Sequence, residues 1–297
     1  MSSMIKVRVP ATSANLGPGF DCLGLALDIW NEVSFEEANE LRYHCEGEGA
    51  EKLNKGNRNL LTKAYARLFE ACGQKMSGFH IFAHNEIPMS SGLGSSAAAI
   101  VAGLFGANEI LGKPLAPGDL LKLAAEMEGH PDNVAPALLG GLVVSVTKQT
   151  EIITRRYDIP ALATVIVKPA VDWLTKTARA VLPKSVSQAD AIHNIGRTAL
   201  VVDALRNGDL VLLQQVMEDR IHQMYRLRHI RAGTAAYKCA KRFGAAALSG
   251  AGPSIIIFTQ ASAAEQTKSE VQSVFEAHGI RARGFITSPS NIGVHTI

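Results

Sequence analysis

The sequence predicts an α+β protein of two domains, and two observations carry this prediction. The first half mixes strand-like and helix-like segments around a Gly/Ser loop. The half after residue 152 has the order strand, helices, strand, strand, helix, strand, which is typical of a ferredoxin-like layer. We therefore expect domains at 1–152 and 153–297, each long enough to bury a core.

In the first half, periodicity and the Gly and Pro positions indicate the elements. The first expected strand ends at Pro10. Small residues after a Gly/Ser loop predict a helix over 96–111, and a second helix is expected to start with Asp119 as N-cap and to stop at Gly129. The strands expected in this half cover 4–9, 79–84 and 142–146.

In the second half, a polar stretch over 150–160 marks the expected boundary. Asn207 and Gly208 separate two expected helices, and Ser262 with Glu265 has the spacing of a capping box for a later helix. The expected helices cover 188–206, 209–218 and a segment from 262 to about 278; the expected strands cover 162–167, 245–248, 254–258 and 281–286.

Composition bounds the class of protein. Hydrophobic residues make up 47% and charged residues 19%, which is an ordinary globular balance. The net charge of +3, without a dense Lys/Arg run, gives no reason to expect a nucleic-acid partner. No apolar run is long enough to span a membrane, the first ten residues lack a signal-peptide pattern, and the four cysteines lie far apart. We expect reduced thiols and a cytoplasmic location.

The most informative segment is a Gly/Ser loop followed by a helix of small residues. Glycines let backbone N–H groups approach a phosphate closely, and the start of a helix adds unpaired N–H groups and a positive dipole end. A hydroxyl there, such as that of Ser96, can also bind the Mg²⁺ that accompanies ATP. The residues expected to bind ATP are Pro88, Met89, Ser90, Ser91, Gly92, Leu93, Gly94, Ser95, Ser96, Ala97 and Ala98.

Three other interpretations of this loop compete with an ATP phosphate loop. Residues 92–97 also fit the dinucleotide pattern GxGxxA, but these glycines lie five or more residues beyond the expected strand end. A Walker A loop needs a lysine after its glycines, and none follows here. The third interpretation is an ordinary connection before a helix.

Three motifs spread along the chain resemble those of the GHMP kinases. They are PATSANLGPGFD at 10–21, the loop PMSSGLGSSAA at 88–98 and SGAGPS at 249–254. The resemblance implies the GHMP kinase fold: an N-terminal ribosomal-S5-like domain and a C-terminal ferredoxin-like α/β sandwich. It also implies ATP and Mg²⁺ as cofactors, and a third motif that supports the phosphate loop.

Within this superfamily, residues 10–21 and EGHPDNVAPA at 128–137 are similar to the homoserine kinases. That resemblance implies transfer of the ATP γ-phosphate to the hydroxyl of L-homoserine, giving O-phospho-L-homoserine and ADP, in threonine biosynthesis, by a homodimer. The alternatives are another GHMP small-molecule kinase and a non-catalytic ligand sensor on this fold. In mevalonate kinases and galactokinases an aspartate stands where Asn133 falls. An amide cannot accept a proton at neutral pH, so no base is expected at Asn133, while Asp132 remains an alternative base.

The resemblance also implies roles for substrate-binding residues. Asp21 would meet the amine, and Arg179 and Arg226 the carboxylate. The other implied positions are Asn15 and Asn133, which would orient the hydroxyl, His130 in the pocket and Thr175 beside the transferred phosphate. Each has a structural alternative: an Asx turn at Asp21, a hydrogen-bonded loop histidine at His130, and surface charges at the two arginines. The chain departs from the family at Met224, where many members have proline, so Arg228 and Arg231 compete with Arg226.

For Mg²⁺ the resemblance implies Ser96 and a glutamate on the helix before the 128–137 segment. Glu126 is the first choice and Glu128 the second; residues two apart on a helix face different directions, so at most one points into the site. Asn59 is expected beside the adenine, with a helix N-cap as its alternative.

Overall fold

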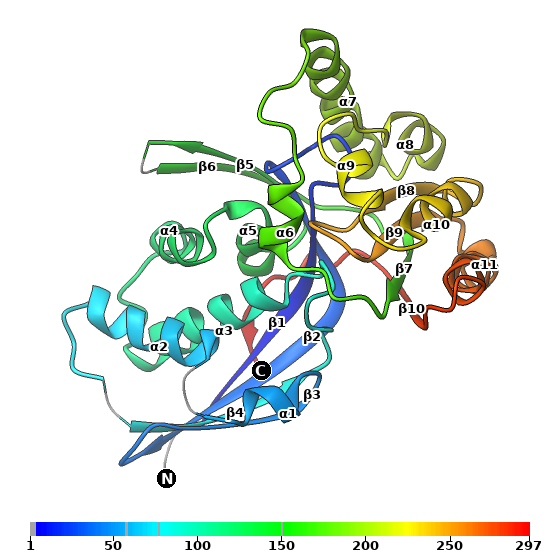
Figure 1. Ribbon diagram of the computed structural model, residues 1–297. Helices are drawn as coiled ribbons and strands as arrows, with labels where there is room; N and C mark the ends of the chain where they lie inside the picture. The colour runs from blue at the N-terminus through cyan, green and yellow to red at the C-terminus, as the bar shows by residue number, and fades with distance from the viewer. Residues whose placement is uncertain (1–3, 57–58, 77, 150) are drawn as a thin grey trace.

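The structure, a computed structural model, describes residues 4–56, 59–76, 78–149 and 151–297. It contains a seven-stranded sheet formed mainly by the first half of the chain and a four-stranded sheet formed by the second half (Figure 1). Within the described residues, no helix combines the length and the apolar character needed to cross a membrane.

The seven-stranded sheet has the order β11-β1-β2-β4-β3, with β5 paired to β2 and β6 to β5. Its β3–β4 pair is parallel and the other pairs are antiparallel. The strand expected to end at Pro10 continues, because the register of β1 on β2 shifts between Pro10 and Ala11 and so accommodates the proline. The strands are β1 (Ile5–Ala14), β2 (Leu23–Ala38), β3 (Arg42–Gly47), β4 (Gly78–Asn85), β5 (Leu142–Lys148), β6 (Glu151–Tyr157) and β11 (His295–Thr296).

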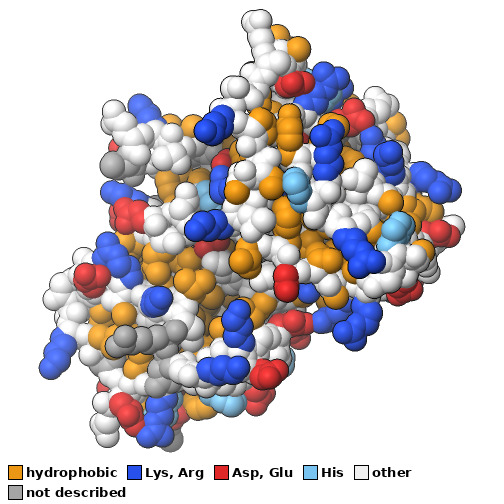
Figure 2. All heavy atoms as spheres, viewed as in Figure 1, with side chains coloured by type: hydrophobic (Ala, Val, Ile, Leu, Met, Phe, Trp, Pro, Cys, Tyr) orange, Lys and Arg blue, Asp and Glu red, His pale blue; other side chains and the backbone are white. Residues whose placement is uncertain are grey.

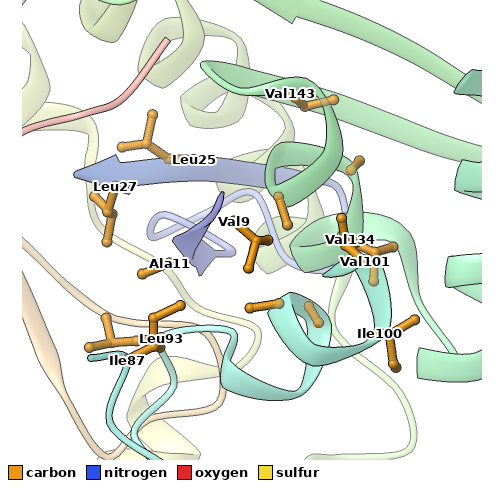
Figure 3. Close-up of a cluster of buried hydrophobic side chains, with 14 of the residues drawn as sticks. Val9, Ala11, Leu25, Leu27, Ile87, Leu93, Ile100, Val101, Val134 and Val143 are labelled. Carbon is orange, nitrogen blue, oxygen red and sulfur yellow. The ribbon is translucent and has the colours of Figure 1, made fainter. Parts of the chain in front are cut away.

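One face of this sheet carries helices. In β4 the burial alternates, with Phe79, Ile81 and Ala83 buried and Phe82 and His84 exposed, as in a sheet covered on one side. Figure 3 shows side chains of the strands and helices meeting in the buried layer between them. The helices of this half are α1 (Ala50–Leu53), α2 (Leu60–Ala71), α3 (Ser95–Ile110), α4 (Pro117–Glu128) and α5 (Pro131–Leu139).

The small-residue helix predicted over 96–111 is confirmed as α3. The predicted stop of α4 is also confirmed, since Gly129 ends it with a left-handed φ of 93°. The predicted N-cap is wrong: α4 begins with Pro117 after Ala116, and Asp119 lies in its first turn. Proline suits a first helical position because no intrahelical acceptor is available there for an N–H.

The four-stranded sheet has the order β10-β7-β9-β8 with every pair antiparallel, which confirms the ferredoxin-like layer. Helix α11 packs on β7 and β10. The capping box expected at Ser262 is wrong, because a 3₁₀ turn over Ala261–Ala263 leads into α11 without a side-chain cap. The strands are β7 (Ala163–Pro169), β8 (Ala245–Leu248), β9 (Ile255–Thr259) and β10 (Ala282–Thr287); the helices are α6 (Thr175–Ala180), α7 (Gln188–Asn207), α8 (Leu210–Val216), α9 (Gln223–Leu227), α10 (Gly233–Ala240) and α11 (Ala264–Glu276).

The boundary predicted at 152 differs from the sheet pairing. Strand β6 pairs with β5 in the first sheet, so the chain leaves that sheet only after Tyr157, and β11 returns to it at the C-terminal end. A polar stretch forms a strand here because its exposed hairpin needs little apolar surface. Thr150, within the polar stretch, lies outside the described residues. Leu16, Val201 and Phe258 belong to one buried cluster, so the two halves share a core.

Candidate active site

The loop between β4 and α3 has the geometry of a phosphate cradle. Gly92 and Gly94 adopt left-handed φ values of 79° and 68°. A Cβ on Gly94 would lie 1.9 Å from Thr12 Oγ1, so only glycine fits there. Gly94 caps α3 without a side-chain hydrogen bond, which leaves the first N–H groups of this helix available to a ligand.

The third motif, 249–254, lies directly behind this loop. Ser249 Oγ donates a hydrogen bond of 2.7 Å to the carbonyl of Gly92, and the N–H of Gly250 donates one of 3.0 Å to the carbonyl of Ala14. A Cβ on Gly92 would lie 2.2 Å from the carbonyl oxygen of Ser249. The second half of the chain therefore supports the phosphate loop, as the resemblance implied.

A cavity of about 270 Å³ extends from this loop and is lined by both halves of the chain. On the face shown in Figure 2, hydrophobic side chains reach the surface in the middle of the molecule, between groups of charged side chains. One part of the cavity is mainly apolar, with Val33, Leu53, Leu61 and Met89 among its residues. The predicted site residues that line the cavity are Asn15, Asp21, Asn59, Met89, Ser90, Ser91, Gly92, Gly94, Ser95, Ser96, Ala98, His130, Asn133, Thr175, Arg179 and Arg226.

Three residues of the predicted ATP loop do not line the cavity. Pro88, Leu93 and Ala97 are buried, and the side chains of Leu93 and Ala97 pack in the core. They shape the loop from behind. Any contact of these residues with a nucleotide through the backbone remains a prediction.

The structure reverses the order of the two candidate glutamates. Glu128 Oε2 accepts a hydrogen bond of 2.6 Å from Ser96 Oγ and lines the cavity. Glu126 is exposed and faces Arg67 at 3.9 Å on the outside of α4. The first choice, Glu126, is corrected to Glu128, because the helical spacing turns only the latter toward α3. Burial raises the pKa of Glu128, against a lowering by Ser96 and His130.

At another part of the cavity, charges of both signs meet. The two terminal nitrogens of Arg179, Nη1 and Nη2, each donate a hydrogen bond of 2.9 Å to the carboxylate of Asp21, and both residues are half-exposed. The Asp21 hydrogen bonds raise the pKa of Arg179. Asp21 has a left-handed φ of 58°, so its backbone forms part of the turn between β1 and β2 while its side chain makes the ion pair.

Arg226 lies deeper and is only 2% exposed. It donates hydrogen bonds to the carbonyls of Ala178 and Gly250 and to His222 Nδ1, at 3.1 to 3.2 Å. No salt bridge within the described ranges involves it, and burial, with repulsion from Arg179, lowers the pKa of Arg226 to about 10. This buried cation is thus poised to attract an anionic group.

The rival arginines lie elsewhere. Arg228 is exposed, and Arg231 donates to the carbonyl of His278 at 2.9 Å on the surface. Neither of these residues lines the cavity. The geometry therefore favours Arg226 as the second arginine of the site.

His130, Asp132 and Asn133 form the start of α5 at the cavity wall. His130 Nδ1 lies 2.5 Å from Asp132 Oδ1, and Asn133 Oδ1 accepts a hydrogen bond of 2.9 Å from Thr12 Oγ1. Burial lowers the pKa of His130, but the hydrogen bond and charge of Asp132 outweigh burial and raise it. Asp132 is only 2% exposed and is engaged by this histidine.

The predicted residues Asn15 and Asn59 form hydrogen bonds that hold segments around the cavity. Asn15 Nδ2 donates to the carbonyl of Gly250 at 2.8 Å, and its Oδ1 accepts from the N–H of Asp21 at 3.0 Å. Asn59 caps α2 in a reciprocal capping box with Thr62, as its alternative interpretation expected, and it also lines the cavity. Its place beside the adenine remains a prediction. Thr175 begins α6 at the cavity edge.

Sequence reasoning missed the residues behind the site. Phe20 stacks on His222 with ring centroids 5.1 Å apart, and Asp219 accepts hydrogen bonds from the N–H groups of His222 and Gln223. Phe20 stands inside the motif at 10–21 and His222 lies four residues before Arg226, but a local motif does not show that they meet across some 200 positions of chain.

Fold and cavity together define a class of phosphotransferase, and comparison with known families agrees. A model described as "GHMP kinases N terminal domain" matches residues 59–141, and one described as "GHMP kinases C terminal" matches residues 201–277.

Similarity to individual proteins identifies one family within this class. A homoserine kinase of Desulfitobacterium hafniense is 39% identical over 99% of this chain and 100% of its own length. One of Moorella thermoacetica is 44% identical over 85% of this chain and 86% of its own. The crystal structure of homoserine kinase from Cytophaga hutchinsonii superposes with a TM-score of 0.88 at 31% identity, covering 100% of this chain and 98% of that one. The chain belongs to the homoserine kinases of the GHMP kinase family.

Proposed function

We propose that this protein transfers the γ-phosphate of ATP to the hydroxyl of L-homoserine, giving O-phospho-L-homoserine and ADP for threonine biosynthesis. The observation that carries the proposal is the charge pattern of the cavity. The phosphate loop and the Asp21, Arg179 and Arg226 cluster line the same cavity. A zwitterionic amino acid with a hydroxyl on its side chain is complementary to this arrangement.

ATP is expected to place its phosphates on the loop at 88–98 and its adenine in the apolar part of the cavity. Ser96 and Glu128 provide a hydroxyl and a carboxylate within 2.6 Å of each other, a hard oxygen pair that suits Mg²⁺. Bound Mg²⁺ supplies neutralisation of the charge on the phosphates. The amides at the start of α3 orient the same phosphates for in-line transfer.

Homoserine binding replaces the ion pair between Asp21 and Arg179. Asp21 binds the substrate amine, and Arg179 with Arg226 binds its carboxylate. A half-exposed ion pair contributes only about 0–1 kcal/mol, so the Asp21–Arg179 pair is readily replaced. Each of its members then faces a group of opposite charge.

The hydroxyl is positioned without a strong base. Asn133, held through its Oδ1 by Thr12, would orient the hydroxyl with its amide N–H groups, and Asn15 holds the loop that carries Asp21. The Oδ1 of Asp132 is already engaged by His130 Nδ1 at 2.5 Å. The proton leaves late, to the transferring phosphate, because the transition state of phosphoryl transfer is loose. Thr175 would lie beside the transferred group.

The test is ADP release with a panel of alcohols. We expect ADP formation that depends on L-homoserine and Mg²⁺, with much lower rates for L-serine, mevalonate and galactose. Preference for another alcohol would point to a different GHMP kinase, and nucleotide binding without turnover to a ligand sensor. The intact phosphate loop and the Ser96–Glu128 pair support an active enzyme over a sensor.

The resemblance also leads us to propose a cytoplasmic homodimer. Light scattering of the purified chain tests the dimer, and fractionation of cells tests the location.

A further inference from the structure

Two like charges stand side by side at the proposed carboxylate end of the cavity. Arg179 lies on α6 and Arg226 on α9, and the charge of Arg179 contributes to the lowered pKa of Arg226. Asp21 holds Arg179 in the ion pair described above. Once Asp21 binds the substrate amine instead, repulsion from Arg226 would drive the flexible side chain of Arg179 toward solvent unless another group holds it.

Phe20 contacts both of them. The guanidinium carbon of Arg226 lies 5.2 Å from the centroid of the Phe20 ring, and that of Arg179 lies 5.9 Å from it. Both distances are within the range of a cation–π interaction. Both arginines are among the described residues that line the cavity and Phe20 is not, so the ring contacts them without being part of the cavity wall.

The ring also stacks on a histidine. His222 stacks on Phe20 at 5.1 Å with an interplanar angle of 25°. Its Nε2–H donates to the carbonyl of Gly17 at 2.8 Å, and its Nδ1 accepts from Arg226 at 3.1 Å. Phe20, His222 and Arg226 therefore form a closed unit that joins α9 to the loop after β1.

We propose that Phe20 is a positioning residue that sets the spacing of Arg179 and Arg226, and so the selectivity of this kinase for substrates with a carboxylate. The proposal rests on the proposed function, since it assigns the carboxylate to these arginines. The negative face of the ring attracts both cations, which offsets their mutual repulsion. An aliphatic side chain of similar size fills the space but lacks this attraction.

The test compares Phe20→Leu with Phe20→Tyr, which keeps the aromatic face. Each is assayed with L-homoserine and with 3-aminopropan-1-ol, the same alcohol without its carboxylate. We expect Phe20→Leu to raise KM for homoserine about tenfold, with kcat and KM for ATP nearly unchanged. The ratio of kcat/KM for homoserine to that for the amino alcohol should fall about as much, and Phe20→Tyr should restore it.

Phe82→Leu is the matched control, because Phe82 is exposed on the uncovered face of the first sheet. It should leave both kcat/KM values as in the wild type. If Phe20→Leu does not fold, as judged by its thermal transition, Phe20→Met replaces it.

The possible failures are distinct. A wild-type protein that does not phosphorylate homoserine overturns the proposed function and this proposal with it. An active wild type for which the Phe20 variants lower kcat/KM equally for both alcohols shows a merely structural role. An unchanged homoserine KM in Phe20→Leu overturns the proposal as well.

Discussion

Arg179 and Arg226 are two residues of one kind in opposite surroundings. Arg179 is half-exposed and bound to Asp21, whereas Arg226 is buried and held by carbonyls and a neutral histidine. Removing Arg226 would leave buried carbonyls and a histidine nitrogen without a donor, so its loss affects folding as well as binding. Arg179 therefore offers the cleaner test of carboxylate recognition.

We expect Arg179→Ala to raise KM for homoserine by an amount equal to roughly 2–4 kcal/mol of binding free energy, because one charged contact to the carboxylate is lost. KM for ATP should stay close to the wild-type value. Lys176→Ala, which removes an exposed charge from the same helix, is the control. An unchanged homoserine KM would refute the role of Arg179.

The pair Glu128 and Glu126 gives a second test at the residue scale. Glu128→Gln removes the charge beside Ser96, and we expect the Mg²⁺ concentration needed for half-maximal rate to rise about tenfold or more. Glu126→Gln changes an equal charge on the outside of the same helix and should have little effect. A titration of initial rate with Mg²⁺ measures both, and the reverse result would restore Glu126 as the ligand.

At the scale of elements, the phosphate loop depends on glycine for two separate reasons. Left-handed φ values are costly for other residues, and at Gly92 and Gly94 the space for a Cβ is also taken. At Gly92 the occupant is the backbone of Ser249, which cannot give way without moving the third motif. A side chain at position 92 would therefore push the phosphate loop and the third motif apart.

Gly92→Ala and Gly112→Ala separate these two reasons. Both glycines have similar left-handed φ values, of 79° and 76°, but a Cβ on Gly112 would meet nothing within 4 Å. We expect Gly112→Ala to lower the free energy of unfolding by about 1–2 kcal/mol, from backbone strain alone. Gly92→Ala should cost more and also raise KM for ATP. Urea unfolding measures the difference, and equal losses would show that the contact with Ser249 is unimportant.

At the scale of the whole molecule, a buried polar network ties the second half to the loop after β1. Asp219 accepts from the N–H groups of Ile221, His222 and Gln223, and from Asn194, which also donates to the carbonyl of Pro18. His222, fully buried, joins this network to Gly17. The loop after β1 is therefore held by Asn194 of α7 and by His222 at the start of α9, both far later in the chain.

This network predicts a pH dependence of stability. Burial lowers the pKa of His222, with Asp219 and Asp21 acting to raise it and Arg226 to lower it. The folded protein keeps His222 neutral, while the unfolded chain takes up a proton below about pH 6.5. The free energy of unfolding should therefore be fully retained above this pH and should fall as pH drops below it, by at most about 1.4 kcal/mol per pH unit from this group.

His222→Gln is the comparison for that measurement. It should be less stable at pH 7 and lose less stability between pH 7 and pH 5 than the wild type. The raised pKa of His130 acts in the opposite direction, with a contribution that is lost as pH rises, but it is common to both proteins. Parallel curves for the two proteins would contradict a neutral, buried His222.

Local chemistry explains which parts of the fold could be predicted. Strand β4, helix α3 and the strands of the ferredoxin-like layer were predictable because alternation and small-residue runs are properties of neighbouring residues. The cap at Asp119 and the capping box at Ser262 failed because many sequences satisfy such patterns without using them. Strand β6 was missed because an exposed, polar hairpin carries little hydrophobic signal.

The sequence alone identified the class of protein, and most of the site residues it predicted line the cavity. Phosphate binding needs glycines and a helix start that are contiguous in the chain, so a local pattern reveals them. Only the packing of the helices brings Glu128 rather than Glu126 beside Ser96, and Arg226 rather than Arg228 or Arg231 to the cavity, since these placements depend on which helix face meets the cavity. It alone brought Phe20 and His222 together beside the arginines. Contacts between distant segments follow from the packing of the whole chain, and no local pattern encodes them.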